Sequence, residues 1–235
     1  MKKIEVIAFD ADDTLWVNEP NFRETEEKFC DLLKDYLPKE SVSKELFSTE
    51  MGNLALYGYG VKSFVLSMLE TLVRITNNST SLELVQKVIL LGKELLQKPV
   101  ELLDGVKEVL VKLNGDYHLV LATKGDLLDQ ERKLSNSGLE KYFHHIEIMS
   151  DKKTSDYSKL LENINCEPEN FLMVGNSLKS DIIPVLELGG YAVHVPFHIT
   201  WSHEKIDYKI KNPKFTEANN ITELLKILRS KDFYC

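Results

Sequence analysis

An apolar run near the start of the chain is followed by three acidic residues, and this segment constrains the fold more than any other. Residues 4–9 (IEVIAF) are short, rich in β-branched and aromatic types apart from Glu5, and lack a helical period, so they predict a buried strand. Asp10, Asp12 and Asp13 follow directly. Carboxylates clustered at the end of a buried strand repel one another, so a cation is expected among them. The cluster therefore predicts a functional site.

Apolar runs and amphipathic stretches alternate along the rest of the chain. The other strand-like runs are 117–122, 171–174, 191–195 and, more weakly, 146–149. The helix-like stretches between them are 106–113, 127–136, 157–163 and 180–188. This alternation predicts an α/β fold, a Rossmann-like and mostly parallel sheet with helices on both faces. In such sheets a ligand binds outside the carboxyl ends of the strands, near the point where the strand order reverses.

Residues 16–99 break this alternation, because they contain no convincing strand. Apolar residues recur there at three- and four-residue spacing in the stretches 22–36, 44–56, 61–75 and 82–96, which predicts helices. The polar segment 77–81 (NNSTS) contains an N-cap candidate for the last of them. The interval is too long for a simple crossover. We therefore expect residues 16–99 to form a helical cap domain, and residues 1–15 and 100–235 to form the catalytic core.

Charge and cysteine usage limit the classes of partner. The net charge is −8, which argues against a nucleic acid or an anionic membrane as the main partner but not against a small anionic substrate. The three cysteines show no CxxC spacing, which favours free thiols in a reducing compartment. The sequence also shows no signal peptide and no run of roughly 20 apolar residues, which favours the cytoplasm. We expect a cytoplasmic monomer or homodimer. The pair His144–His145 and the segment 201–204 (WSHE) are interpreted as loop residues.

Asp10 and Asp12 suit phosphoryl-transfer chemistry. Two carboxylates at positions i and i+2 of an extended or turning segment can point to one site, where one attacks phosphorus and the other moves a proton. Attack by a carboxylate forms an aspartyl-phosphate and splits one difficult displacement into two easier ones. Mg²⁺ suits oxygen ligands and allows an anionic nucleophile to approach an anionic phosphate.

The other parts of such a site follow the other predicted strands. A hydroxyl or amide donor, a lysine and a further acid are needed to bind the phosphoryl oxygens and the metal. The residues of these types that follow predicted strands are Thr123 and Lys124, Lys152 and Lys153, Asn176, and Asp181. Because the carboxyl ends of parallel strands meet at one edge of a sheet, these residues are expected to lie together.

With these motifs the chain resembles the haloacid dehalogenase-like hydrolases, most of which are Mg²⁺-dependent phosphatases. Residues 10–15 (DADDTL) match the first motif, residues 122–125 (ATKG) the second, Lys152 or Lys153 the third, and residues 175–181 (GNSLKSD) the fourth. The resemblance implies Asp10 as nucleophile and Asp12 as general acid/base. It also implies phosphate contacts from the second and third motifs, and a helical cap between the first and second. The implied metal ligands are Asp10, the backbone carbonyl of Asp12, and the fourth-motif residues Asn176 and Asp181.

The chain departs from the family pattern at two places. The fourth motif of the family begins Gly-Asp, whereas this chain has Asn176; an amide oxygen still coordinates Mg²⁺ but brings less charge, and Asp181 can supply that charge directly or through water. Lys152 and Lys153 both suit the third motif, and the distance to the helix predicted from Tyr157 favours Lys152.

Four functions remain open at this point. The favoured one is a phosphatase for a small phosphorylated metabolite. A phosphomutase or phosphonatase uses the same fold, and so does a metal-free 2-haloacid dehalogenase, which Asn176 favours. Asp12 disfavours the dehalogenase, because a halide leaving group needs no proton. The last alternative is a non-catalytic binding module, since fold alone does not imply function.

Overall fold

The computed structural model describes residues 4–229, which divide into two compact units. The first unit contains residues 4–19, 100–124 and 130–229, and the second contains residues 20–99 and 125–129. No helix within 4–229 is long and apolar enough to cross a membrane.

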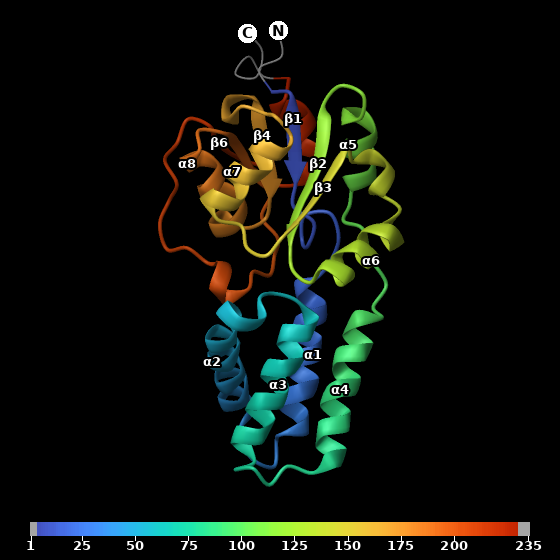
Figure 1. Cartoon of the computed structure of the whole chain (residues 1–235), viewed down its shortest axis with the longest axis vertical. Coiled ribbons are helices and arrows are strands. Elements are labelled where there is room, and N and C mark those ends of the chain that lie inside the picture. The colour runs from blue at the N-terminus through green and yellow to red at the C-terminus, as the bar shows by residue number, and fades with distance from the viewer. Residues whose placement is uncertain (1–3, 230–235) are drawn as a thin grey trace. The chain divides into compact units, whose positions relative to one another are not determined.

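The first unit is built on a parallel six-stranded sheet with the strand order β3-β2-β1-β4-β5-β6 (Figure 1). The strands are β1 (Val6–Phe9), β2 (His118–Lys124), β3 (His145–Met149), β4 (Phe171–Gly175), β5 (Tyr191–His194) and β6 (Phe215–Glu217). The predicted fold class is therefore confirmed. The sequence did not predict β6, because three residues with one large apolar side chain give too short a pattern.

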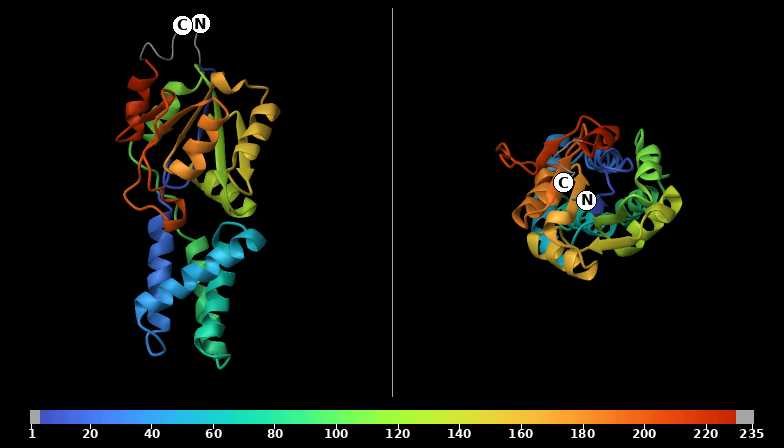
Figure 2. Two further views of the ribbon diagram at one scale, coloured as in Figure 1. Left: turned by 90° about the vertical axis from the view of Figure 1, so that its left-hand side faces the viewer. Right: turned by 90° about the horizontal axis from the view of Figure 1, so that it is seen from above.

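Helices cover both faces of the sheet (Figure 2). Ile7 and Phe9 of β1 pack in one apolar cluster with α5 and α9, whereas Val6 and Ala8 pack in another with α7 and α8. This alternation follows from the two-residue period of a strand. It explains why the run at residues 4–9 is apolar at nearly every position, because both of its faces are buried. The helices of this unit are α5 (Val106–Leu113), α6 (Leu127–Ser137) from residue 130 onward, α7 (Thr154–Asn163), α8 (Ile183–Glu187) and α9 (Leu224–Ile227).

The second unit is helical. Its helices are α1 (Glu19–Leu32), α2 (Lys39–Tyr57), α3 (Val61–Ile75) and α4 (Leu82–Leu96) (Figure 1). Their apolar positions form one core that includes Phe29, Leu46, Met68 and Val88. At the start of α4, the side chain of Ser81 accepts a hydrogen bond from the backbone N–H of Leu84 and so caps the helix.

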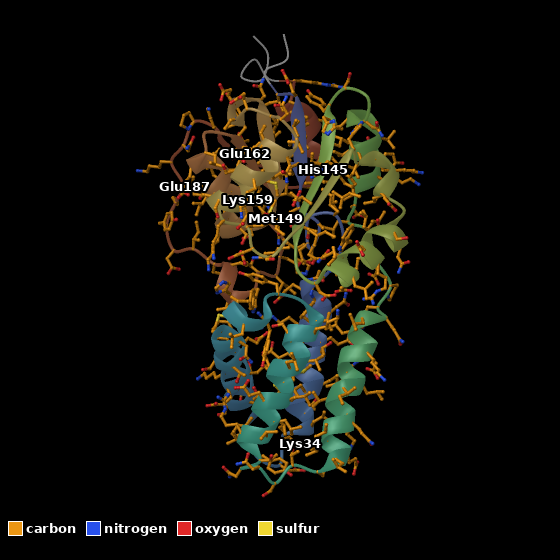
Figure 3. The ribbon with its side chains drawn as sticks, viewed as in Figure 1. Lys34, His145, Met149, Lys159, Glu162 and Glu187 are labelled. Carbon is orange, nitrogen blue, oxygen red and sulfur yellow. The ribbon has the colours of Figure 1, made fainter. Side chains whose placement is uncertain are left out.

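All six strands end at one edge of the sheet, which is where the sequence places its polar residues. Figure 3 labels His145 and Met149, the first and last residues of β3, and so shows which end of the sheet is the carboxyl end. The strand order reverses at β1, whose neighbours are β2 and β4. A ligand is therefore expected at the carboxyl ends of β1 and β4. Short helical turns complete the unit: η1 (Glu140–Tyr142), η2 (Pro168–Asn170), η3 (Leu178–Ile182), η4 (Ser202–Glu204) and η5 (Ile221–Glu223).

Candidate active site

Asp10 lies at the carboxyl end of β1, where three polar groups hold it. Its backbone N–H donates to the carbonyl of Val174 in β4 at 2.9 Å, which continues the ladder one residue past the strand. Its Oδ1 accepts a hydrogen bond from Lys152 Nζ at 2.5 Å, and its Oδ2 accepts one from Thr14 Oγ1 at 3.0 Å. The carboxylate is thus oriented before any ligand arrives.

Lys152 joins two buried carboxylates from different strand ends. Its Nζ donates to Asp10 Oδ1 and, at 2.7 Å, to Asp181 Oδ1, and its side chain is 1% exposed. Burial opposes the charge on Lys152, but the two carboxylates outweigh it and hold its pKa well above the ordinary value. Burial raises the pKa of Asp10 to about 7, against the attraction of Lys152 and with a further rise from Asp181 and Asp12. Two carboxyl groups therefore share one ammonium group at this place.

The neighbouring Lys153 points elsewhere. Its side chain is 73% exposed and its Nζ lies 3.0 Å from Asp151 Oδ2. Its backbone N–H donates to Asp156 Oδ2 at the start of α7, so it serves the helix terminus. Of the two lysines that the sequence left open, the structure places Lys152 beside Asp10 and Lys153 in solvent.

The carboxylate of Asp12 accepts hydrogen bonds from three side chains. Its Oδ1 accepts from Trp16 Nε1 at 2.7 Å and from Lys133 Nζ at 2.6 Å, and its Oδ2 accepts from Gln130 Nε2 at 2.8 Å. Sequence reasoning missed Gln130 and Lys133, which lie three residues apart on α6 and so share a helix face. One feature of the sequence could have indicated these two residues. The predicted helix begins shortly after the second motif, and therefore near the carboxyl ends of the strands.

Asp13, the third acid, is structural. It has a left-handed backbone with φ of 61° and is buried. Its carboxylate accepts the backbone N–H groups of Asn18 and Glu19 at 2.9 to 3.1 Å, which lie where α1 begins and lack partners within the helix. Because both of its carboxylate oxygens accept backbone N–H groups, Asp13 orders the start of α1 and does not face solvent.

The fourth motif brings Asn176 and Asp181 to the end of β4. Asn176 Oδ1 accepts a hydrogen bond from Thr14 Oγ1 at 3.4 Å, so the same hydroxyl contacts both Asp10 and Asn176. Asp181 Oδ2 accepts the backbone N–H of Ser177 at 2.9 Å. A Cβ at Gly175 would lie 2.3 Å from Asp181 Oδ2, so only glycine fits there. Both oxygens of Asp181 are thus engaged by protein donors.

Thr123 and Lys124 end β2, and their surroundings differ. Thr123 is buried. Lys124 Nζ donates to Ser180 Oγ at 2.8 Å and to Glu204 Oε1 at 2.5 Å. The structure therefore pairs Lys124, which the sequence predicted as a phosphate ligand, with a carboxylate that the sequence assigned to a loop.

Glu204 is the centre of this second polar cluster. Its Oε2 accepts hydrogen bonds from Ser177 Oγ and, at 2.6 Å, from Ser180 Oγ. Burial opposes ionisation of Glu204, but the charge of Lys124 and these hydrogen bonds lower its pKa to about 2. Glu204 lies far from its partners in the sequence, so no local pattern could have identified the cluster.

The donor set fits a hard divalent cation. Within residues 4–229, no group of three or more His, Cys, Asp and Glu side chains is arranged to hold a metal ion. The oxygens of Asp10 and Asn176, however, converge on Thr14, and Mg²⁺ accepts amide, carbonyl and carboxylate oxygens with waters completing its shell. Asp10 and Asp181 share the single ammonium group of Lys152, and this surplus of acidic groups favours a cation beside Asp10.

The comparisons with known proteins agree with this architecture. The family model of haloacid dehalogenase-like hydrolases matches residues 4–189. A haloacid dehalogenase-like family hydrolase from Xanthomonas campestris is 35% identical, with a TM-score of 0.88, and the match covers 97% of this chain and 91% of that one. This chain therefore belongs to the haloacid dehalogenase-like hydrolases, and the family prediction is confirmed.

More distant structures share the fold. A predicted phosphoglycolate phosphatase from Haemophilus somnus is 18% identical, with a TM-score of 0.65, and the match covers 97% of this chain and all of that one. A 2-haloacid dehalogenase from Pseudomonas syringae is also 18% identical, with a TM-score of 0.66 and coverage of 96% and 98%. No curated protein matches the chain significantly. Because one fold serves both reactions, the residues of the site must decide between them.

Proposed function

We propose that this hydrolase is a Mg²⁺-dependent phosphatase that acts on a small phosphorylated metabolite through an aspartyl-phosphate on Asp10. In the first step Asp10 Oδ attacks phosphorus, the bond to the leaving oxygen breaks, and Asp12 donates a proton to that oxygen. In the second step water displaces Asp10 and gives a proton to Asp12. Lys152 holds Asp10 and offsets the charge that collects around the phosphoryl group.

The observation that supports the proposal is the hydrogen bonding of the Asp12 carboxylate. This carboxylate, two residues after the nucleophile, accepts hydrogen bonds from three side chains, those of Trp16, Gln130 and Lys133. A proton-transferring acid is needed when the leaving group is an alkoxide and is useless when it is a halide. The organised Asp12 therefore supports a phosphatase over a dehalogenase.

In this proposal Asp10 and Asn176 would hold the metal with their side-chain oxygens, and Asp12 would hold it with its backbone carbonyl. When bound, Mg²⁺ lowers the repulsion between an anionic nucleophile and an anionic phosphate. Asp181, whose oxygens already accept from Lys152 and Ser177, contributes charge and orients Lys152. We also propose that residues 16–99 act as the cap that selects the leaving group.

The test is hydrolysis of p-nitrophenyl phosphate with Mg²⁺ and with excess chelator. Wild-type protein should release phosphate only with the metal, and Asp10→Asn should lower turnover below a few per cent of wild type. The matched control is Asp104→Asn, an exposed acid, which should leave turnover unchanged. Turnover that persists in chelator would refute the metal assignment, and an active Asp10→Asn variant would refute the nucleophile.

The second candidate is the 2-haloacid dehalogenase, which the neutral Asn176 favours. The same protein samples should therefore be tested for chloride release from 2-chloropropionate without metal. Chloride release without phosphatase activity would favour this candidate. The hydrogen bonds to Asp12 would then have no role in catalysis.

A further inference from the structure

Gln130 carries a buried oxygen that has no hydrogen-bond partner among residues 4–229. The side chain is 4% exposed. Its Nε2 donates to Asp12 Oδ2 at 2.8 Å and to the backbone carbonyl of Lys124 at 3.3 Å. Both of these partners are acceptors, so the amide cannot be turned round, and Oε1 must be the atom without a partner. A buried acceptor left unpaired costs about 1–3 kcal/mol, so a donor is expected at this position.

The two oxygens of Asp12 are used unequally by the described part of the chain. Oδ1 accepts from both Trp16 and Lys133, whereas Oδ2 accepts only from Gln130. A carboxylate oxygen has two lone-pair sites. Within residues 4–229, Oδ2 is therefore the oxygen with a lone pair left for a proton. It is also the oxygen bound to the amide of Gln130, so the proton acceptor and the unpaired Oε1 are neighbours.

We propose that Gln130 orients the water that hydrolyses the aspartyl-phosphate. The inference rests on the phosphatase proposed above. A water that gives one proton to a base has a second O–H that needs an acceptor. Asp12 Oδ2 takes the first proton, and Gln130 Oε1 accepts a hydrogen bond from the second O–H. The two acceptors together fix the direction from which the water oxygen approaches phosphorus.

The step balances in atoms and charge. The water oxygen forms a bond to phosphorus while the bond from phosphorus to the Asp10 oxygen breaks, and that electron pair returns to the Asp10 carboxylate. One proton of the water moves to Asp12, and the other remains on the hydrogenphosphate that leaves. Gln130 Oε1 acts in this second half of the reaction. With a leaving group that needs no general acid, loss of Gln130 should therefore have little effect on formation of the aspartyl-phosphate, although its Nε2 also binds Asp12.

The test uses Gln130→Met, which keeps the approximate volume and removes the acceptor Oε1 together with the Nε2 donor to Asp12 and Lys124. The substrate is p-nitrophenyl phosphate, whose acidic phenol leaves without a general acid. Slower hydrolysis of the intermediate should lower kcat by about 10- to 100-fold. KM should fall by the same factor, and kcat/KM should not change, because kcat/KM reports the first half of the reaction. Acid quenching should trap more phosphoenzyme than in wild type. Gln86→Met, at an exposed position of α4, is the matched control and should behave as wild type.

Parallel losses of kcat and kcat/KM without trapped phosphoenzyme would overturn the proposal, because they indicate a general disturbance of the site. An unchanged kcat would overturn it too. Absence of phosphoenzyme and of hydrolysis in wild-type protein would instead refute the underlying phosphatase proposal. Circular dichroism shows whether Gln130→Met folds. If it does not, Gln130→Asn is tested in the same assay, because its side chain is one methylene shorter and its amide oxygen cannot reach the same position.

Discussion

Replacing Glu204 with glutamine should destabilise the protein by about 2–3 kcal/mol at neutral pH. The pKa of Glu204 falls from its ordinary 4.5 to about 2 in the folded state, and a shift of that size corresponds to about 3 kcal/mol. The side chains of Lys124 and Glu204 are 16% and 10% exposed, so water screens their attraction only partly. Glutamine keeps an acceptor for Ser177 and Ser180, which is why the expected loss lies slightly below the full value.

The sign of the pH dependence follows from the lowered pKa. A carboxyl that ionises more easily in the folded state stabilises that state fully above the ordinary pKa of 4.5, and this stabilisation is lost as the pH falls through about 2. The difference between wild type and Glu204→Gln should therefore be largest at pH 7 and should shrink towards zero on acidification. Urea unfolding at several pH values measures it.

The controls separate the ion pair from other effects. Glu101→Gln removes an exposed carboxylate and should change the free energy of unfolding by less than about 0.5 kcal/mol. The double variant Glu204→Gln/Lys124→Met should lose less than the sum of the single variants, because the uncompensated ammonium is gone. An additive cycle, or a Glu204→Gln loss that is the same at pH 7 and pH 3, would refute the reasoning.

Two further predictions concern the ends of β4 and the start of α7. Asn176→Asp should lower the Mg²⁺ concentration that gives half-maximal turnover, because a carboxylate brings more charge to the metal than an amide; an unchanged metal titration would show that residue 176 is not a ligand. Tyr157→Phe should unfold with a free energy equal to wild type or up to about 1 kcal/mol higher, since the buried hydroxyl has no partner within residues 4–229. The control is Tyr36→Phe at an exposed position, and a clear loss of stability in Tyr157→Phe would contradict this prediction.

The sequence predicted the central strands and the order of polar residues after them, because both are local patterns. A strand such as β1 that is buried on both faces is apolar at nearly every position, and the polar residues that end it follow directly in the chain. Parallel topology then brings Asp10 and Lys152 together without any knowledge of tertiary contacts. These parts of the site are predictable because the carboxyl ends of parallel strands lie at the same edge of the sheet, so the residues that follow them lie close together.

Partners supplied by helix faces and loops were not predictable. Gln130 and Lys133 occupy an amphipathic helix, where glutamine and lysine are the ordinary residues of a solvated face. Glu204 belongs to a short turn whose sequence shows no sign that Lys124 and Ser180 will bind it. In each case the contact depends on how separate elements pack, so the local spacing of polar and apolar residues cannot predict it.

The pairing of charges gives Asn176 a physical rationale. Lys152 binds Asp10 and Asp181, and Lys133 binds Asp12. When all three carboxyl groups are ionised, they therefore exceed their two ammonium partners by one negative charge. With a divalent cation bound, as the proposed mechanism requires, the site would carry one positive charge and would attract a phosphate dianion. An aspartate at position 176 would cancel this charge before the phosphate arrived. The neutral amide therefore weakens the hold on the metal and strengthens the hold on the phosphate. Asn176→Asp should show both changes, with a lower metal requirement and a higher KM, and a variant that improved both would refute this balance.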